Sequence, residues 1–477
     1  MRIAFLNPMF GADFTKSARW FARSRGRVQR HPDYFCTGAA VLEAAGHDVL
    51  LCDAQAKNLP TQDLLPRLKE FAPDIIVCQT STPSIDSDIA AARLCKDATG
   101  AFNVLVGPHV SAEWEDTLVR AGGVVEAVAV GEYDYTIRDI AGGVALKDCP
   151  GCAWWDHGRA VRNAPRPYIS DLDALPFPAW RHIDLSDYRD AGKLFPFITL
   201  ITGRGCPNRC SFCQLPQVMN GRQYRMRSVE SVIAEIEYDL RLFPNIQEVM
   251  FEDDTLTMRE SQDRLVRLCE ALVRRRFPVC WSANARVDVN DVEVLRLMKR
   301  SGCRMLCVGF EFGDQAMLDG VNKGTTIEQM EIFAANARRA GIRVHGCFMF
   351  GGPGETLATA RKTIALARRL RIDTAQFSGI VAYPGSEYYE WAKANGYLVP
   401  QDWRGYVDSD YEQVATVSLP GLSAAQINAL IDEALRAFYL SPSQMMRMFF
   451  KIRSMADVRA KWHGLRAFAG YALRRGR

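Results

Sequence analysis

Short apolar runs alternate with longer amphipathic stretches along residues 1–142. Runs typical of β-strands occupy residues 3–7, 49–53, 74–79, 103–107 and 127–130. Stretches with helical spacing lie between them, for example residues 38–45, 87–98 and 114–121. This βαβ alternation predicts a parallel sheet with helices on both faces, which is a Rossmann-like α/β domain.

The same alternation returns after an irregular connector at residues 143–194. In the connector, Asp156-His157-Gly158-Arg159 lies between two apolar runs and predicts a β-hairpin, and four prolines at residues 165–178 predict an extended linker. Six further strands are predicted at residues 195–201, 248–251, 279–281, 305–309, 344–350 and 376–381. Helices are predicted between them at residues 229–242, 261–275, 292–300, 327–340 and 358–370.

Six βα units predict a partial (β/α)6 barrel over residues 195–398, open on one side, where a bulky substrate enters. Residues 399–477 have helical and basic character and form the last part of the chain. In parallel sheets and in (β/α) barrels, ligands bind beyond the carboxyl ends of the strands. Polar residues at those ends are therefore the candidates for a functional site.

The loop after the first barrel strand carries three closely spaced cysteines. Cys206, Cys210 and Cys213 have the spacing C-x3-C-x2-C. Three thiolates on one loop suit an iron–sulfur cluster, and a [4Fe–4S] cluster would keep one iron free for another ligand. A zinc loop needs a fourth cysteine or histidine nearby, and no other lies between His182 and Cys269. The spacing therefore favours a cluster with one open iron.

Composition limits the remaining choices. The 48% hydrophobic and 24% charged residues are ordinary for a soluble globular protein, and the net charge of +4 is too small to indicate a nucleic-acid partner. The amino-terminal sequence leads directly into a strand, and no apolar run is long enough for a transmembrane helix. Fourteen cysteines without a secretion signal indicate free thiols in a reducing cytoplasm. The pair Cys149 and Cys152 is either structural or an auxiliary cluster site.

The cysteine loop resembles the signature of radical S-adenosylmethionine (SAM) enzymes, in which SAM occupies the fourth iron. Later segments resemble that family in order: GFEFG at residues 309–313, KGTT at 323–326, GGPGET at 351–356 and YPGS at 383–386. Phe312 replaces the serine that is usual in the first of these. The resemblance implies SAM contacts at the strand ends, for which the candidates are Phe212, Asp253, Asp254, Ser282, Asn284, Arg286, Glu311 and Gly352.

For the neighbouring carboxylates Asp253 and Asp254, one alternative stays open: they cap the helix that follows.

The N-terminal third resembles the cobalamin-binding domain fused to many radical SAM enzymes. The matching segments are LNP at residues 6–8, AAVLEAAGHDV at 39–49, VGPH at 106–109 and VGE at 130–132. The D-x-H-x-x-G motif that supplies a histidine to cobalt elsewhere is absent, so a purely structural domain is the alternative. The resemblance implies cobalamin contacts at Asn7, Asp53, Thr80, Ser81, Gly107, Pro108, His109, Gly131 and Glu132.

The combined resemblance implies an enzyme that cleaves SAM reductively at a [4Fe–4S] cluster and attacks an unactivated C–H bond. With cobalamin as methyl carrier, C-methylation in secondary-metabolite or lipid biosynthesis is the leading expectation. An oxidative cyclase or rearrangement enzyme acting on a tetrapyrrole- or isoprenoid-type substrate is the alternative, and a non-catalytic sensor is disfavoured by the set of SAM motifs. A flavodoxin- or ferredoxin-type donor would supply the electron, and the substrate would be a small, apolar molecule.

The C-terminal segment is basic and amphipathic. Asp457 is the only acid after Ser441, among many arginines, lysines and large apolar residues. Such helices either lie on anionic membranes or pack on the protein with the basic face in water. Peripheral membrane contact of a cytoplasmic enzyme is therefore one of two expectations for this segment.

Overall fold

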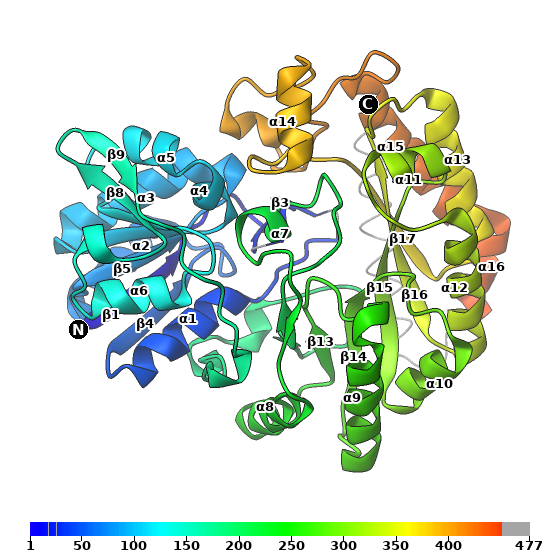
Figure 1. Cartoon of the computed structure of the whole chain (residues 1–477), viewed down its shortest axis with the longest axis horizontal. Helices are drawn as coiled ribbons and strands as arrows, with labels where there is room; N and C mark the ends of the chain where they lie inside the picture. Colours follow the sequence, from blue (N-terminus) through cyan, green and yellow to red (C-terminus); the bar gives the residue numbers. More distant parts are fainter. Residues whose placement is uncertain (18, 25, 451–477) are drawn as a thin grey trace.

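Two α/β domains lie side by side in the computed structural model, which describes residues 1–17, 19–24 and 26–450 (Figure 1). The N-terminal domain is drawn in blue and cyan, and the barrel domain in green to yellow. The short helix α7 (Leu215–Val218) lies between the two sheets in this view. The predicted basic segment at residues 451–477 lies outside the described residues.

The N-terminal sheet has the strand order β4-β1-β5-β6-β7-β8-β9. Its first five strands are parallel, as the alternation predicted, and β8 and β9 form the predicted antiparallel hairpin. The strands are β1 (Arg2–Asn7), β4 (Asp48–Asp53), β5 (Ile75–Gln79), β6 (Phe102–Val106), β7 (Ala127–Ala129), β8 (Cys152–Asp156) and β9 (Arg159–Arg162). Because β8 pairs with β7, this sheet continues beyond residue 142.

Helices connect the parallel strands of the N-terminal sheet. They are α1 (Asp33–Ala44), α2 (Thr61–Phe71), α3 (Ile85–Thr99), α4 (Pro108–Ala112), α5 (Trp114–Ala121) and α6 (Asp134–Ala141). The sequence did not predict the antiparallel pair β2 (Phe14–Lys16) and β3 (Phe21–Arg23). Strands of three residues are too short to show the two-residue alternation that identifies a strand.

The barrel sheet consists of six parallel strands in sequential order. They are β10 (Phe197–Leu200), β13 (Glu248–Phe251), β14 (Cys280–Ala285), β15 (Cys303–Glu311), β16 (Arg343–Phe350) and β17 (Thr374–Gly379). Within the described residues β10 and β17 do not pair with each other, so the predicted partial barrel is confirmed and stays open. Buried and half-buried residues alternate along β16 and β17, so one face packs on helices and the other lines the interior.

Helices cover the outer face of this sheet (Figure 1). They are α8 (Val229–Leu242), α9 (Gln262–Arg275), α10 (Val292–Arg300), α12 (Ile327–Ala340), α13 (Leu357–Arg369) and α15 (Ala424–Tyr439). Shorter helices are α11 (Gln315–Gly320), α14 (Glu387–Ala394) and α16 (Pro442–Phe450). Among the described residues no helix combines the length and apolarity that crossing a membrane requires.

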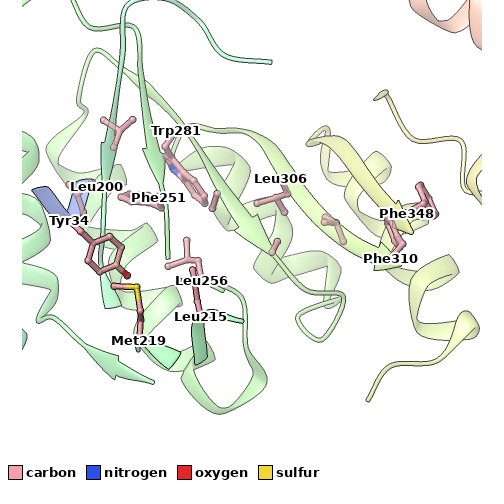
Figure 2. Close-up of a cluster of buried hydrophobic side chains, with 14 of the residues drawn as sticks. Tyr34, Leu200, Leu215, Met219, Phe251, Leu256, Trp281, Leu306, Phe310 and Phe348 are labelled. Atoms are coloured by element: carbon pink, nitrogen blue, oxygen red, sulfur yellow. The ribbon is translucent and has the colours of Figure 1, made fainter. Parts of the chain in front are cut away.

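One apolar core continues from the N-terminal domain into the barrel. Figure 2 shows Tyr34 of α1 beside Met219, with Leu200 and Leu215 of the barrel domain close by. The same cluster of buried side chains continues through Phe251 and into the barrel. Because this core is shared, apolar burial favours one fixed arrangement of the domains.

Buried ion pairs add a specific connection across the same interface. Glu132, which follows β7, accepts two hydrogen bonds from the Arg225 guanidinium, at 2.8 and 2.7 Å. Asp134 accepts two from Arg204, at 2.7 and 3.4 Å. Arg204 and Arg225 belong to the short antiparallel strands β11 (Gly203–Arg204) and β12 (Arg225–Met226), which flank the cysteine loop. The interface therefore joins the N-terminal sheet directly to the base of that loop.

Arg225→Ala should destabilise the protein by about 3–5 kcal/mol, because it leaves the buried Glu132 carboxylate without its bidentate partner. Urea unfolding of the anaerobically purified protein measures this. Arg296→Ala removes an arginine from an exposed pair with Glu293 and should cost about 1 kcal/mol or less. Equal losses in the two variants would contradict a special role for the interface pair.

Candidate functional site

The cysteine loop is held by backbone hydrogen bonds from three separate parts of the chain. Cys206 N–H donates to the Gly221 carbonyl at 3.1 Å. Ser211 N–H donates to the Val321 carbonyl, and the Ser211 carbonyl accepts from Tyr388 N–H, both at 3.0 Å. The segments before α8, after α11 and at the start of α14 thus fix the conformation of the loop.

The three cysteine thiols lie in a common, mostly buried environment. Cys206 and Cys210 are buried and Cys213 is half-buried. Burial raises the pKa of the Cys213 thiol, and negative charge on Cys210 and Cys206 raises it further. Three thiolates therefore repel one another here, and bound iron would relieve that repulsion. The donor set fits the predicted iron–sulfur cluster.

Two side chains donate hydrogen bonds to these sulfurs. Asn208 Nδ2 lies 3.3 Å from Cys206 Sγ, and Arg286 Nη1 lies 4.0 Å from Cys210 Sγ. Hydrogen bonds to the sulfurs and nearby positive charge are the features by which a protein adjusts the reduction potential of a cluster.

Gly205 is required by the backbone path into the loop. Its φ is +90°, and a Cβ added there would lie 2.1 Å from the Gln223 carbonyl oxygen. Its N–H donates to Asp254 Oδ2 at 2.7 Å. The residue before the first cysteine must therefore be glycine for steric reasons as well as for its backbone angle.

The two predicted carboxylates after β13 have different surroundings. Asp253 is fully buried and accepts hydrogen bonds from Thr202 N–H, Thr202 Oγ1 and Tyr224 OH at 2.5–2.6 Å. Asp254 contacts Gly205 of the cysteine loop, and its Oδ1 accepts from the Arg19 guanidinium at 2.9 Å. Asp254 is thus the carboxylate that lies against the loop and already carries a cationic partner.

Two of the remaining SAM candidates, Arg286 and Glu311, are connected near Cys210 through Lys323, and a third, Asn284, contacts the Asp253 backbone. Asn284 Nδ2 donates to the Asp253 carbonyl at 3.2 Å, and Arg286 Nη2 donates to the Lys323 carbonyl at 2.9 Å. Lys323 Nζ is 2.8 Å from Glu311 Oε1. Ser282 lies apart from this group. It precedes Asn284 by two residues on β14, about 7 Å along the strand, and it contacts Lys193 and Glu248.

The glycine turn after β16 is closed by its own glutamate. Gly351 and Gly352 N–H groups donate to the Glu355 carboxylate, the latter at 3.0 Å. Phe312, which replaces the usual serine, packs where a Gly352 side chain would be, 3.0 Å from its Cβ position. Phe212, the last SAM candidate, is half-buried within the cysteine loop.

Three buried hydroxyl groups near the predicted residues have no partner among the residues that the structure describes. They are Ser211 Oγ in the cysteine loop, Thr255 Oγ1 after Asp254 and Thr325 Oγ1 after Lys323. A buried polar group without a partner indicates a missing ligand or water. Sequence reasoning did not name these residues as contacts, although Ser211 and Thr255 adjoin the predicted contacts Phe212 and Asp254, and Thr325 lies in the KGTT segment.

The carboxyl ends of the N-terminal strands form the candidate cobalamin rim, and several of its polar residues bond to one another. Asn7 Nδ2 and Tyr188 OH both donate to Asp53, each at 2.9 Å. Thr80 Oγ1 donates to the Val106 carbonyl at 2.8 Å. Ser81 N–H donates to Asp88, which forms a buried ion pair with Lys16 of β2 at 2.5 Å.

His109, at the start of α4, is the rim residue with a free ring nitrogen. Its Nδ1 lies 3.2 Å from Thr82 Oγ1, while Nε2 is buried and has no partner within residues 1–17, 19–24 and 26–450. Burial lowers the pKa of His109 to about 3, so the ring is neutral. The adjoining Gly107 has φ +123°, and Pro108 begins the helix. A neutral imidazole with an unused nitrogen fits a rim that binds a large cofactor.

The last two rim candidates lie at the interface with the cysteine loop. Gly131 has φ +77° and its N–H donates to Ser111 Oγ at 3.0 Å. Glu132 binds Arg225, as described above, so its carboxylate belongs to the domain interface. Helix α7, directly after the cysteine loop, packs against α4 of the rim.

Comparison with known proteins adds independent support for both halves. Residues 200–367 match the radical SAM superfamily, and residues 36–141 match the B12-binding domain. A Pyrococcus horikoshii protein described as an uncharacterized methyltransferase is 30% identical over 410 residues, which cover 85% of this chain and 87% of that protein. The chain belongs to the B12-binding radical SAM enzymes.

Two further comparisons agree with this membership. The anaerobic magnesium-protoporphyrin IX monomethyl ester cyclase of Rubrivivax gelatinosus is 27% identical over 415 residues, covering 82% of this chain and 70% of the cyclase. The structure of a radical SAM methyltransferase from Kitasatospora setae, with tryptophan and a SAM analogue bound, superposes with a TM-score of 0.68 at 19% identity and covers 93% and 90% of the two chains. The latter establishes a common fold.

As a B12-binding radical SAM enzyme, the chain has a [4Fe–4S] cluster, SAM and cobalamin as its cofactors. The cysteine donor set, the three buried hydroxyls and the free nitrogen of His109 are compatible with these groups. The assignment of individual residues to each cofactor stays a prediction.

Gly205→Ala should reduce the iron content of the anaerobically purified radical SAM protein from about four per chain to below about one. The reason is that the new Cβ overlaps the Gln223 carbonyl and displaces the cysteine loop. Iron and sulfide analysis measures the change. Gly396→Ala is the matched control, because φ there is +69° and nothing lies within 4 Å of the added Cβ. An iron loss of the same size in both variants would contradict the steric argument.

Glu355 should make stability depend on pH. Burial raises its pKa from 4.5 to about 7. The folded protein therefore keeps a proton that the unfolded chain releases, and this stabilisation is complete below pH 4.5 and is lost as pH rises through about 7. Urea unfolding at about pH 5.5 and about pH 7.5 should show a larger fall in stability for the natural protein than for Glu355→Gln. The exposed Glu328→Gln variant is the control and should follow the natural protein.

Proposed function

We propose that the chain is a cobalamin-dependent C-methyltransferase that acts on an unactivated carbon of a small, apolar molecule. The observation that supports this most is the position of the cysteine loop between the two domains. The loop adjoins Asp254 and Arg286 on the barrel side and continues into α7, which packs on the rim helix α4. A cluster on this loop would thus face the same interface as a cofactor on the rim.

In this proposal, Cys206, Cys210 and Cys213 hold the cluster, and Asn208 and Arg286 donate hydrogen bonds to its sulfur ligands. Asp254, Asn284, Arg286 and Glu311 bind the charged and polar groups of SAM. The unpartnered hydroxyls of Ser211, Thr255 and Thr325 accept or donate the remaining hydrogen bonds. Asp253 supports Thr202 and Tyr224 and acts by positioning its neighbour Asp254.

His109, Gly107 and Gly131 hold cobalamin at the rim, where the positive φ values of the glycines keep the backbone close to the ligand. When bound, the three cofactors supply a low-potential electron, a carbon-centred radical and a transferable methyl group. The protein orients the substrate between the two domains and excludes water from it. The substrate enters through the open edge between β10 and β17.

A second candidate is an oxidative cyclase that uses the same cofactors without methyl transfer. It is supported by the similarity to the Rubrivivax gelatinosus cyclase over 82% of this chain. The two reactions differ in the product, since methylation adds one CH2 group and oxidative cyclisation adds none.

Two further parts of the proposal concern partners. A flavodoxin- or ferredoxin-type protein supplies the electron. The basic C-terminal segment contacts an anionic membrane, which suits an apolar substrate. Met445 and Met446 of α16, which precedes this segment, are 54% and 58% exposed.

Anaerobic purification with cobalamin supplied, followed by iron and cobalt analysis and a SAM-cleavage assay under reductant, tests the function. We expect about four irons, one cobalamin and release of 5′-deoxyadenosine, with Cys210→Ala abolishing the release. Cys280→Ser, a cysteine outside the loop, is the control and should keep full activity. Iron with SAM cleavage but without cobalt would overturn the methyl-transfer proposal, and the absence of SAM cleavage would overturn both candidate reactions.

A further inference from the structure

Strands β15 and β16 bring two cysteines and a histidine together on the interior face of the barrel. Cys307 lies on β15, and His345 and Cys347 lie on β16. In the parallel register, Cys307 pairs with His345, and Gly309 pairs with Cys347. One ligand atom from each of the three side chains lies within 4.8 Å of the others, and all three residues are half-buried. This cluster shares no residue with the cysteine loop.

The separation of the two sulfurs fits a common metal ion. Cys307 Sγ and Cys347 Sγ are 3.6 Å apart. Two thiolates bound to one tetrahedral zinc at about 2.3 Å each are separated by about 3.8 Å. A disulfide would bring the sulfurs to about 2.0 Å. The observed spacing is therefore that of two ligands on one edge of a tetrahedron.

The histidine is oriented by a neighbour on the next strand. His345 Nδ1 lies 2.8 Å from Thr374 Oγ1 of β17. In the tautomer that donates from Nδ1 to this hydroxyl, Nε2 carries the lone pair that binds a metal, and the Gln376 side chain is a further hydrogen-bond partner of the ring. Metal-binding histidines commonly have such a partner, because it fixes both the tautomer and the ring direction.

The surrounding charges are compatible with two thiolates. Lys193 and Arg30 are the positively charged groups whose electrostatic attraction favours the thiolate of Cys307. Arg30 is itself paired with Asp190 at 3.1 Å and with Glu252 at 3.5 Å, so little net positive charge opposes a cation. Two thiolates and one Zn²⁺ together carry no net charge, which lowers the cost of burial in this interior.

We propose that Cys307, His345 and Cys347 bind one Zn²⁺ ion. Two thiolates and an imidazole are the donors that zinc prefers, and three protein ligands leave one coordination position open. Because the three residues line the barrel interior, the fourth position faces that interior. The open position would bind a thiolate sulfur, or an alkoxide or carboxylate oxygen, of a bound molecule. The site exists or fails independently of methyl transfer.

Zinc analysis of the anaerobically purified, reduced holoenzyme tests the proposal. We expect about one zinc per chain and X-ray absorption showing two sulfurs at about 2.3 Å and one nitrogen at about 2.0 Å. Cys307→Ser and Cys347→Ser should each lower zinc at least tenfold, and His345→Gln should remove the nitrogen scatterer. Cys280→Ser, a half-buried cysteine on β14 outside the cluster, should leave zinc unchanged. Iron content, measured on every sample, shows that each variant is folded.

Two results would overturn the proposal. One is a natural protein that contains less than about a tenth of an equivalent of zinc and takes up none from added Zn²⁺ under reducing conditions. The other is zinc that persists in both serine variants, which would place the ion elsewhere. Because the absorption spectrum is recorded on the natural protein, the test holds even if a variant does not fold. Neither readout depends on SAM cleavage, so failure here is distinct from failure of the proposed reaction.

Discussion

The buried pairing of Glu132 with Arg225 is the interaction on which the site depends. Arg225 binds Glu132 of the N-terminal domain with both terminal nitrogens, and the same guanidinium donates to the Asn220 carbonyl at 2.7 Å. Asn220 Nδ2 in turn contacts Tyr34 of α1 and Asp254 of the barrel. Since Asp254 accepts from Gly205, one chain of polar contacts runs from the N-terminal sheet to the cysteine loop. The domain interface and the loop therefore form together.

Several polar strand-end residues bond within the protein. At a free sheet edge such residues would face a ligand or water, but here each meets a partner from another segment of the chain. Glu132 accepts hydrogen bonds from Arg225, Asp53 accepts one from Tyr188, and Asp253 accepts them from Thr202 and Tyr224. Buried carboxylates need such partners, because an unpaired one would cost several kcal/mol. Among the described residues, His109 Nε2 and the three hydroxyls around the loop are buried polar groups without such a partner.

The barrel interior contrasts with its outer face. Residues of β15, β16 and β17 that point toward the helices are large and apolar, such as Phe310, Phe348 and Phe377, and these rings stack across the strands. Apart from Met349, the residues on the half-buried, inward face of β16 and β17 are small or polar, and this face includes Cys347 of the interior cluster. An interior lined in this way suits chemistry and ligand binding, while the stacked rings supply the rigidity that positions it.

The sequence by itself determined the order of the main strands and helices and placed many of their ends within a few residues, since the periodicity of apolar residues reports directly which face each element buries. The predicted strand at residues 248–251 and the helices at 229–242, 292–300 and 327–340 have the same bounds in the structure. The sequence also identified the cysteine loop, because Cys206, Cys210 and Cys213 lie close together along the chain. Only the tertiary structure could show that Glu132 pairs with Arg225, that Ser282 contacts Lys193, and that the Cys307 and Cys347 sulfurs lie close together. Each of those contacts joins residues far apart in the sequence, and their distances follow from domain packing and strand register rather than from any local pattern.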